Sequence, residues 1–189
     1  MSYKTEIQNN QHEITRRRFM QLSSAVGLAS VLAFPVYAAP SSLLLEAGEI
    51  PLPQTPINTE GGAKFILSEL REFDLVINFW ATWCPPCVHE LPQLNTITTE
   101  LNAEGIKVIL VSMDRGGAAV AASFLSQRKI TAPLSLYDPS ASWARALGLK
   151  GLPTTLLIKK NSASYQVHTG PADWDNDKIK GQIRKYLAS

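Results

Sequence analysis

The chain has 189 residues, of which 45% are apolar, and this length and composition suit one packed domain rather than two. Its formal net charge of +2 comes from the first 38 residues, which hold four of the 18 basic and two of the 16 acidic side chains, so the remainder is neutral. A neutral domain with scattered charges disfavours nucleic acid as a partner and offers no polybasic patch to a membrane.

Residues 1–38 have the pattern of an export signal. The sequence T-R-R-R-F-M at residues 15–20 resembles the twin-arginine signal, a weakly apolar run fills residues 22–38, and Ala38 and Ala39 suit cleavage. The run contains serines, a glycine and a proline, and it is shorter than the roughly 20 residues that cross a bilayer. We expect export to the periplasm. An uncleaved anchor, which would tie the chain to the membrane through this segment alone, and a disordered basic tail remain as alternatives.

A proline-rich lead-in follows over residues 39–60, and the predicted domain occupies residues 61–189. The four prolines and few apolar periods of the lead-in predict a loop, with an edge strand as the alternative. The domain opens with a helical spacing of Phe65, Ile66 and Leu70, which predicts a short helix.

Two continuous apolar runs, residues 75–80 and 105–111, are typical of strands covered on both faces. Between them, residues 84–103 show the apolar spacing of a helix. Strand, helix and strand within about forty residues form a βαβ unit, which implies a parallel pair and a right-handed crossover.

The rest of the chain alternates helical and extended patterns. Helices are predicted over 118–127, 140–147 and 173–187, and strands over 133–137, 154–158 and 165–168. The last two strands are close enough in sequence to form a hairpin. Together the elements predict an α/β domain with a central mixed sheet flanked by helices.

Cys84 and Cys87 are the chain's two cysteines, and they lie where a buried strand gives way to a helix. The free N–H groups and the macrodipole of a helix N-terminus stabilise a thiolate, and Pro85 and Pro86 suit a first turn because their missing N–H groups would have no intrahelical partner. A disulfide across so short a loop adds little stability. The pattern therefore predicts thiol–disulfide exchange, in which Cys84 attacks a substrate disulfide and Cys87 resolves the mixed disulfide.

Other uses of the two sulfurs remain as alternatives. Zinc needs about four ligands, and the sequence offers no second Cys or His pair. An inert structural disulfide is disfavoured by the short loop. A Cu(I) carrier could add His89 or His168 to the sulfurs, although both histidines are expected to face solvent. A peroxidase would use Thr82, but a resolving cysteine so close to Cys84 suits exchange better. We expect no bound metal and no cofactor.

Four motifs carry a family resemblance. They are F-W-A-T-W-C-P-P-C (79–87), H-E-L-P (89–92), V-S-M-D (111–114) and G-L-P-T-T (151–155). From about residue 63 to the C-terminus, the chain resembles the periplasmic TlpA/ResA/CcmG branch of the thioredoxin superfamily. The resemblance implies a thioredoxin fold with the central insertion of that branch, here between Asp114 and Leu152.

The resemblance also implies roles for residues around the cysteine pair. Pro153 is expected to be cis and to face the pair, and the backbone of Leu152 to bind the substrate strand. Trp83, with the two prolines between the cysteines, is expected to contact the substrate. Glu90, one helical turn after Cys87, would relay a proton to or from it, with an exposed surface glutamate as the alternative.

Two further positions follow from the same resemblance. Asn78 stands where many thioredoxins carry a buried aspartate, and because an amide is no proton acceptor, the acid–base work shifts toward Glu90. Pro92 is expected to kink the helix that begins at the cysteines, or else to end its first segment.

The function that the resemblance implies is a periplasmic protein-disulfide reductase. Such proteins draw electrons from a membrane thiol donor and keep thiols of apocytochrome c or of metal-site proteins reduced. The direction of exchange is not fixed by the residues, because about 30 mV of potential corresponds to only about 1.4 kcal/mol. A Cu(I)-binding chaperone that uses the same cysteines is the alternative.

Overall fold

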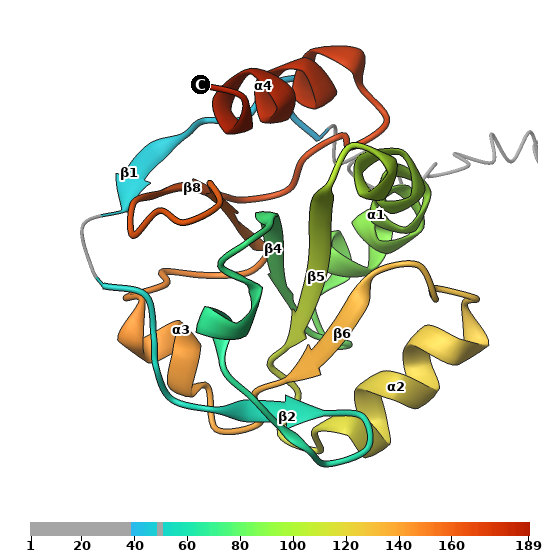
Figure 1. The fold of residues 1–189 in the computed structure, drawn as a ribbon. Coiled ribbons are helices and arrows are strands. Elements are labelled where there is room, and N and C mark those ends of the chain that lie inside the picture. The colour runs from blue at the N-terminus through green and yellow to red at the C-terminus, as the bar shows by residue number, and fades with distance from the viewer. Residues whose placement is uncertain (1–38, 49–50) are drawn as a thin grey trace, which may run out of the picture. The chain divides into compact units, whose positions relative to one another are not determined.

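A mixed sheet of eight strands runs through the part of the chain that the computed structural model describes, residues 39–48 and 51–189 (Figure 1). These residues belong to one compact unit. The strands are β1 (Glu46–Gly48), β2 (Ile57–Thr59), β3 (Lys64–Phe65), β4 (Asp74–Trp80), β5 (Ile106–Ser112), β6 (Leu134–Tyr137), β7 (Thr154–Ile158) and β8 (Tyr165–Thr169). The helices are the 3-10 helix η1 (Leu67–Leu70), α1 (Pro85–Ala103), α2 (Ala118–Gln127), α3 (Ser142–Ala146) and α4 (Asp177–Leu187).

The strand order is β1-β8-β7-β4-β5-β6-β2-β3. β4, β5 and β6 are parallel, which confirms the predicted βαβ unit, while β7, β8 and β1 continue the sheet antiparallel on the other side of β4. In the register, Val76 lies between Val108 of β5 and Leu157 of β7. The result is the α/β thioredoxin fold that the sequence predicts, with α2, β6 and α3 in the segment of the expected insertion.

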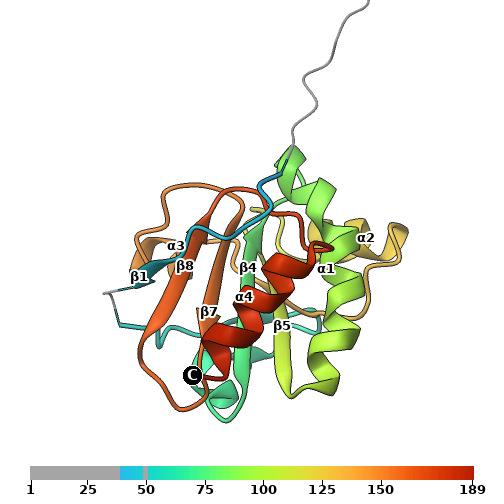
Figure 2. The ribbon, with the colours of Figure 1, turned by 90° about the horizontal axis from the view of Figure 1, so that it is seen from above.

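Alternation along β4 divides the core into two layers, one on each face of the sheet. Figure 2 shows α1 and α4 on the same side of the sheet. The layer on that side contains, among others, Val76, Trp80, Leu91, Leu94, Leu125, Ile179 and Ile183. The opposite layer contains Ile77, Phe79, Leu67, Leu136, Trp143 and Leu156. Each of these buried side chains contributes about 1.5–3 kcal/mol by leaving water, so β4 is a firm base for the segment that follows it.

The predicted signal sequence at residues 1–38 lies outside the described residues, so its end at Ala38 stays a prediction. Within residues 39–48 and 51–189, none of the helices combines the length and the apolar character that crossing a bilayer requires.

The beginning of the domain differs from expectation. The helix predicted from Phe65, Ile66 and Leu70 is wrong: Phe65 lies in β3 and pairs with Ile57 of β2, and only a 3-10 turn follows. Gly62 has a positive φ of 79° in the turn between the two strands. Two consecutive glycines are a hairpin signal, because glycine adopts this conformation without steric cost.

His168 is buried, so its expected exposure is wrong, whereas His89 is exposed as predicted. Its Nδ1 accepts a hydrogen bond from the Leu44 N–H at 3.1 Å, and its Nε2 lies 3.3 Å from the Pro171 carbonyl oxygen. The lead-in covers this ring, because it runs beside β8 and forms the edge strand β1 there. The sequence pattern of the lead-in did not show which side chains it would bury.

Candidate active site

The two cysteines form a disulfide at the N-terminus of α1, with an S–S distance of 2.08 Å. Cys84 is the N-cap residue, with φ −102° and ψ 98°, and its Sγ accepts a hydrogen bond from the Cys87 N–H at 3.4 Å. Pro85 and Pro86 occupy the first helical positions, as predicted, where an N–H would have no partner. An N–H group and the positive end of the helix dipole are therefore directed at Cys84 Sγ, an arrangement that stabilises a thiolate on this sulfur.

The surroundings of the disulfide differ between its two ends. Both cysteines are buried, with exposed fractions of 5% for Cys84 and 1% for Cys87. Trp83, directly before Cys84, is 66% exposed, and Pro85 is also exposed. An incoming disulfide would therefore meet Trp83 and Cys84 first, while Cys87 stays behind them.

The Leu152–Pro153 peptide bond is cis, as predicted. The Gly170 N–H donates to the Pro153 carbonyl oxygen at 2.9 Å and fixes the loop against the end of β8. Leu152 and Trp83 line one shallow pocket of about 280 Å³, which places the proline loop beside the cysteine loop. Among the described residues, no group hydrogen-bonds the backbone N–H or carbonyl of Leu152, so both are available to a substrate strand.

A buried aspartate holds the turn that carries the cysteines. The carboxylate of Asp114 accepts hydrogen bonds from the Thr82 N–H at 3.0 Å, the Thr82 hydroxyl at 2.6 Å and the Ser112 hydroxyl at 2.9 Å. Asp114 lies two residues after the end of β5, so it ties that strand to the residues before Cys84. Sequence reasoning noted the V-S-M-D motif but gave Asp114 no role; a charged residue after a buried strand was the available signal.

Glu90 is buried, with an exposed fraction of 1%, so the alternative of a surface glutamate is wrong. Its Oε1 accepts a hydrogen bond from the Ala172 N–H. Burial raises the pKa of the carboxyl from 4.5 to about 8, and hydrogen bonding from Ala172, Trp174 and Asn78 opposes that rise. Glu90 follows Cys87 by three positions on α1, a spacing that puts both side chains on one face of the helix. The site thus holds a carboxyl group that takes up and releases protons near neutral pH.

The two side chains that lower the pKa of Glu90 come from β4 and from the loop before α4. Asn78 of β4 donates from Nδ2 to the Thr155 hydroxyl of β7 at 3.0 Å. Trp174 lies in the loop before α4, and its backbone N–H donates to Gln93 Oε1 of α1 at 3.1 Å. Sequence reasoning singled out Asn78 but missed Thr155 and Trp174, because the register of β7 brings Thr155 to Asn78 and the path of the last loop brings Trp174 to α1.

α1 runs through Pro92 to Ala103, so the alternative in which Pro92 ends the first helical segment is wrong. Pro92 is exposed, while Leu91 and Leu94 on either side of it are buried. The helix therefore keeps its apolar face on the sheet across the proline.

No group of three or more His, Cys, Asp or Glu side chains in residues 39–48 and 51–189 is arranged to hold a metal ion. Both ring nitrogens of His168 already have backbone neighbours, at Leu44 and Pro171, so this histidine is not free to join the sulfurs in a copper site. To bind copper, the two cysteines would first have to be reduced, and they would have to bind the ion without help from His168.

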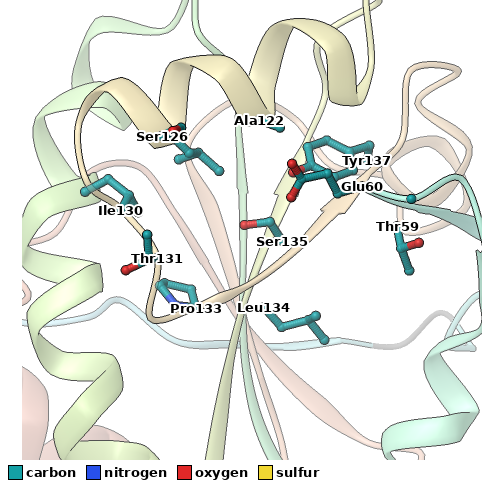
Figure 3. Close-up of a pocket in the computed structure, with 12 residues that line it drawn as sticks. Thr59, Glu60, Ala122, Ser126, Ile130, Thr131, Pro133, Leu134, Ser135 and Tyr137 are labelled. Atoms are coloured by element: carbon teal, nitrogen blue, oxygen red, sulfur yellow. The ribbon is translucent and has the colours of Figure 1, made fainter.

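A larger pocket, of about 490 Å³, lies between α2 and the strands β6 and β2 (Figure 3). Glu60 and Tyr137 point into it, and the pKa of the Tyr137 hydroxyl is raised by burial and then by the Glu60 charge. None of its lining residues belongs to α1, to the cis-proline loop or to the segment around Trp83. It therefore contributes no side chain to the chemistry of the cysteines.

Comparison with known proteins agrees with the geometry. The family described as Redoxin matches residues 46–183. Over 158 residues the chain is 30% identical to the thiol-disulfide oxidoreductase ResA of Halalkalibacterium halodurans, an alignment that covers 82% of this chain and 88% of that protein. The crystal structure of a Chlorobium tepidum protein assigned as thiol:disulfide interchange protein DsbE aligns with a TM-score of 0.65 and 29% identity, over 76% of this chain and 99% of that one. A secreted Mycobacterium tuberculosis disulfide oxidoreductase, 21% identical with a TM-score of 0.58, covers 70% of this chain and 96% of its own and supports the fold alone.

Proposed function

Because the chain belongs to the redoxin family and is a thiol–disulfide oxidoreductase of the ResA/DsbE type, we propose that it reduces disulfides of exported proteins through Cys84 and Cys87. The observation that carries the proposal is the disulfide at the N-terminus of α1, with the Cys87 N–H directed at Cys84 Sγ. This arrangement makes Cys84 the better nucleophile and leaving group of the pair.

In the first step the reduced enzyme attacks. The thiolate of Cys84 displaces one sulfur of the substrate disulfide, so that an S–S bond forms between Cys84 and the substrate while the other substrate sulfur leaves as a thiolate and takes up a proton. Trp83 and Leu152, which line one pocket, support the substrate chain. The unpaired backbone groups of Leu152 then bind it as an extended strand.

In the second step Cys87 resolves the mixed disulfide. Its thiol gives a proton to the carboxylate of Glu90, and the resulting thiolate attacks Cys84 Sγ, which releases the reduced substrate as a thiolate. The products are the Cys84–Cys87 disulfide and a neutral Glu90. Burial raises the pKa of Glu90 to about 8, so that a proton on this carboxyl is retained at neutral pH.

Cysteine variants test this assignment. Cys84→Ser should abolish reduction of insulin disulfides, whereas Cys87→Ser should accumulate a mixed disulfide with the substrate that a reductant releases. In the reduced wild type, iodoacetamide should modify Cys84 faster than Cys87. Equal alkylation rates of the two thiols, or turnover by Cys84→Ser, would contradict the assigned roles.

We further propose that the chain is exported by the twin-arginine signal, is cleaved near Ala38 and works in the periplasm. There it would receive electrons from a membrane thiol donor and reduce apocytochrome c or metal-site proteins. Replacing Arg16 and Arg17 with lysine should leave the chain in the cytoplasm, as fractionation would show. Export of that variant would contradict the proposal that the chain is exported by a twin-arginine signal.

The substrate can be identified by trapping. Cys87→Ser expressed in the periplasm should retain its substrates as mixed disulfides, which mass spectrometry identifies after release with reductant. Cys84→Ser is the matched control, because it keeps a cysteine but lacks the nucleophile. Capture of the same proteins by both variants would show that the trapped adducts do not report turnover.

A further inference from the structure

A series of hydrogen bonds joins the lead-in to the carboxyl group of Glu90. The Leu44 N–H donates to Nδ1 of His168 at 3.1 Å, and Nε2 on the other side of that ring lies 3.3 Å from the Pro171 carbonyl oxygen. The N–H of the same peptide unit, which belongs to Ala172, donates to Glu90 Oε1. The carbonyl and the N–H of a trans peptide point in opposite directions, so one peptide unit connects the imidazole to the carboxyl.

The neighbours of His168 place its ring proton. Because Nδ1 accepts from the Leu44 N–H, the proton of the neutral ring belongs on Nε2, which then donates to the Pro171 carbonyl oxygen. The other tautomer could donate from Nδ1 to the Leu44 carbonyl oxygen, 3.4 Å away, but its bare Nε2 would then face the Pro171 oxygen, acceptor against acceptor. An imidazolium also carries a proton on Nε2, so the bond to Pro171 does not depend on the charge of the ring.

The series lies mostly out of water, since His168, Ala172 and Glu90 are all buried. Away from water, one hydrogen bond strengthens the next in a series by about 10–30%. A donor on the Pro171 carbonyl draws electron density from the peptide and makes the Ala172 N–H a stronger donor. Burial has the largest effect on the pKa of Glu90 and raises it, and the Ala172 N–H is the foremost hydrogen bond that lowers it. The imidazole therefore acts on the carboxyl through the peptide and favours its ionised form.

We propose that His168 is a positioning residue, which favours the ionised form of Glu90 by donating through the intervening peptide, and that the lead-in supports the active site because Leu44 fixes the ring. The inference rests on the proposed function, in which the carboxylate of Glu90 takes the proton of the Cys87 thiol. A carboxyl that is ionised more often accepts this proton more often, so the donor on the ring should speed up the resolving step near neutral pH. The ring itself gains and loses no proton in that step.

Other ionisable groups on the elements around Glu90 must be separated from it in a titration. α1 contributes Cys87, which does not titrate in the disulfide form. The loop before α4 contributes Asp173, β8 contributes His168 itself, and the lead-in contributes the exposed Glu46 at the start of β1. Oxidised protein is therefore the form to titrate, with the midpoint of each of these groups recorded alongside that of Glu90.

A matched pair of variants separates the donor on the peptide from the anchor of the lead-in. His168 and Gln182 each accept a hydrogen bond from the lead-in backbone, but both hydrogen bonds of Gln182 go to Leu43, whereas His168 also reaches the Pro171 carbonyl oxygen. In nuclear magnetic resonance, His168→Leu should raise the midpoint of the Glu90 carboxyl carbon by about half a pH unit, a roughly threefold change in the ratio of carboxylate to acid. Gln182→Leu should leave the midpoint unchanged, and His168→Gln, which keeps an amide N–H donor, should restore most of it.

An unchanged midpoint in His168→Leu, or an equal rise in Gln182→Leu, would overturn the proposal. If His168→Leu does not fold, nitrogen-15 spectra of the neutral ring in the wild type decide the matter. A proton on Nδ1 and none on Nε2 would overturn the proposal, whereas a proton on Nε2, with an Ala172 amide that shifts at the Glu90 midpoint, would support it.

The pH profile of resolution separates this inference from the proposed function. In His168→Leu, the inflection in the rate at which Cys87 resolves a preformed mixed disulfide should move upward with the Glu90 midpoint. A raised midpoint with an unmoved inflection would remove Glu90 as the base of the proposed function and leave the effect of His168 on its carboxyl intact. An unmoved midpoint in a variant that still resolves with the wild-type profile would instead overturn this inference alone.

Discussion

At the scale of single residues, the burial of Glu90 sets the pH at which its carboxyl group can act as a base. Its carboxyl is nearly inaccessible, and burial is the largest cause that raises its pKa to about 8. A base must be ionised before it accepts a proton, so resolution by Cys87 should speed up as the pH rises through about 8. Glu90→Gln should lose this inflection and resolve the mixed disulfide roughly 100-fold more slowly at pH 8.

The measurement is stopped-flow resolution of a preformed mixed disulfide at Cys84, followed from pH 6 to 10. The attack of Cys84 on substrate, measured separately in the Cys87→Ser background, is the control, because that step does not use Glu90 as a base. An unchanged pH profile of resolution in Glu90→Gln would reduce the glutamate to a structural residue.

Trp83 is the second residue that a substitution can test. It is 66% exposed beside the nucleophile, and a large exposed aromatic side chain next to a reactive sulfur is suited to partner binding. Trp83→Ala should lower kcat/KM for a protein disulfide about tenfold while leaving the rate with a small aromatic disulfide within about twofold, since one lost contact is worth about 1.4 kcal/mol.

Leu134→Ala is the matched control, because Leu134 is also exposed, at 42%, but lines the pocket next to α2 and not the one at Trp83. Insulin reduction and reduction of the small disulfide would be measured for both variants. Equal losses with the two substrates in Trp83→Ala would show that the indole shields the sulfur and does not bind the partner.

At the scale of elements, α4 is held to the molecule by apolar burial. Ile183 is fully buried against α1 and the sheet, whereas the ion pair between Arg184 and Glu104 joins two half-exposed side chains. Ile183→Ala should lower the free energy of unfolding by about 3 kcal/mol, and Glu104→Gln by less than about 1 kcal/mol. Urea unfolding of both variants checks this, and a larger loss from Glu104→Gln would reverse the ranking.

Elements held by buried apolar side chains could be predicted from the sequence, whereas elements held mainly by backbone pairing could not. The apolar runs at residues 75–80 and 105–111 predict β4 and β5, because a strand covered on both faces is apolar along its whole length. β1 and β3 are the two edge strands and β2 lies between β3 and β6; all three are only two or three residues long and are held by backbone hydrogen bonds, so their side chains carry almost no pattern. The fold was therefore predictable at its centre and not at its edges.

The residues of the site also differ in how far the sequence predicts them. The positions of Cys84 and Cys87 could be predicted from local sequence, a helix start and a two-residue spacing, whereas the cis bond before Pro153 followed only from the family resemblance of the motif around it. The contacts of Glu90 with Asn78 and Trp174 could not, because they depend on how β4 and the last loop pack against α1. Long-range packing leaves no periodic trace in the sequence.

At the scale of the whole molecule, the buried carboxyl makes stability depend on pH. In the unfolded chain the Glu90 pKa is near 4.5, and in the folded protein it is about 8, so between these values the folded state binds the extra proton. The free energy of unfolding should therefore fall as the pH rises from about 4.5 to about 8, by up to about 5 kcal/mol in total from this group. Below this window the contribution is constant, and above it the loss is complete.

Glu90→Gln removes the titrating group while keeping the size of the side chain and an oxygen that can accept from the Ala172 N–H. Oxidised wild type and variant would be unfolded in urea at pH 5, 7 and 9. The variant should gain stability relative to the wild type as the pH rises, because only the wild type must then bury a carboxylate or carry the cost of protonating it. Other groups titrate in both proteins, so the difference between the two curves isolates Glu90. Parallel curves would mean that the folded protein solvates the Glu90 carboxylate as well as water does, which its burial among Leu91, Trp174 and the sheet argues against.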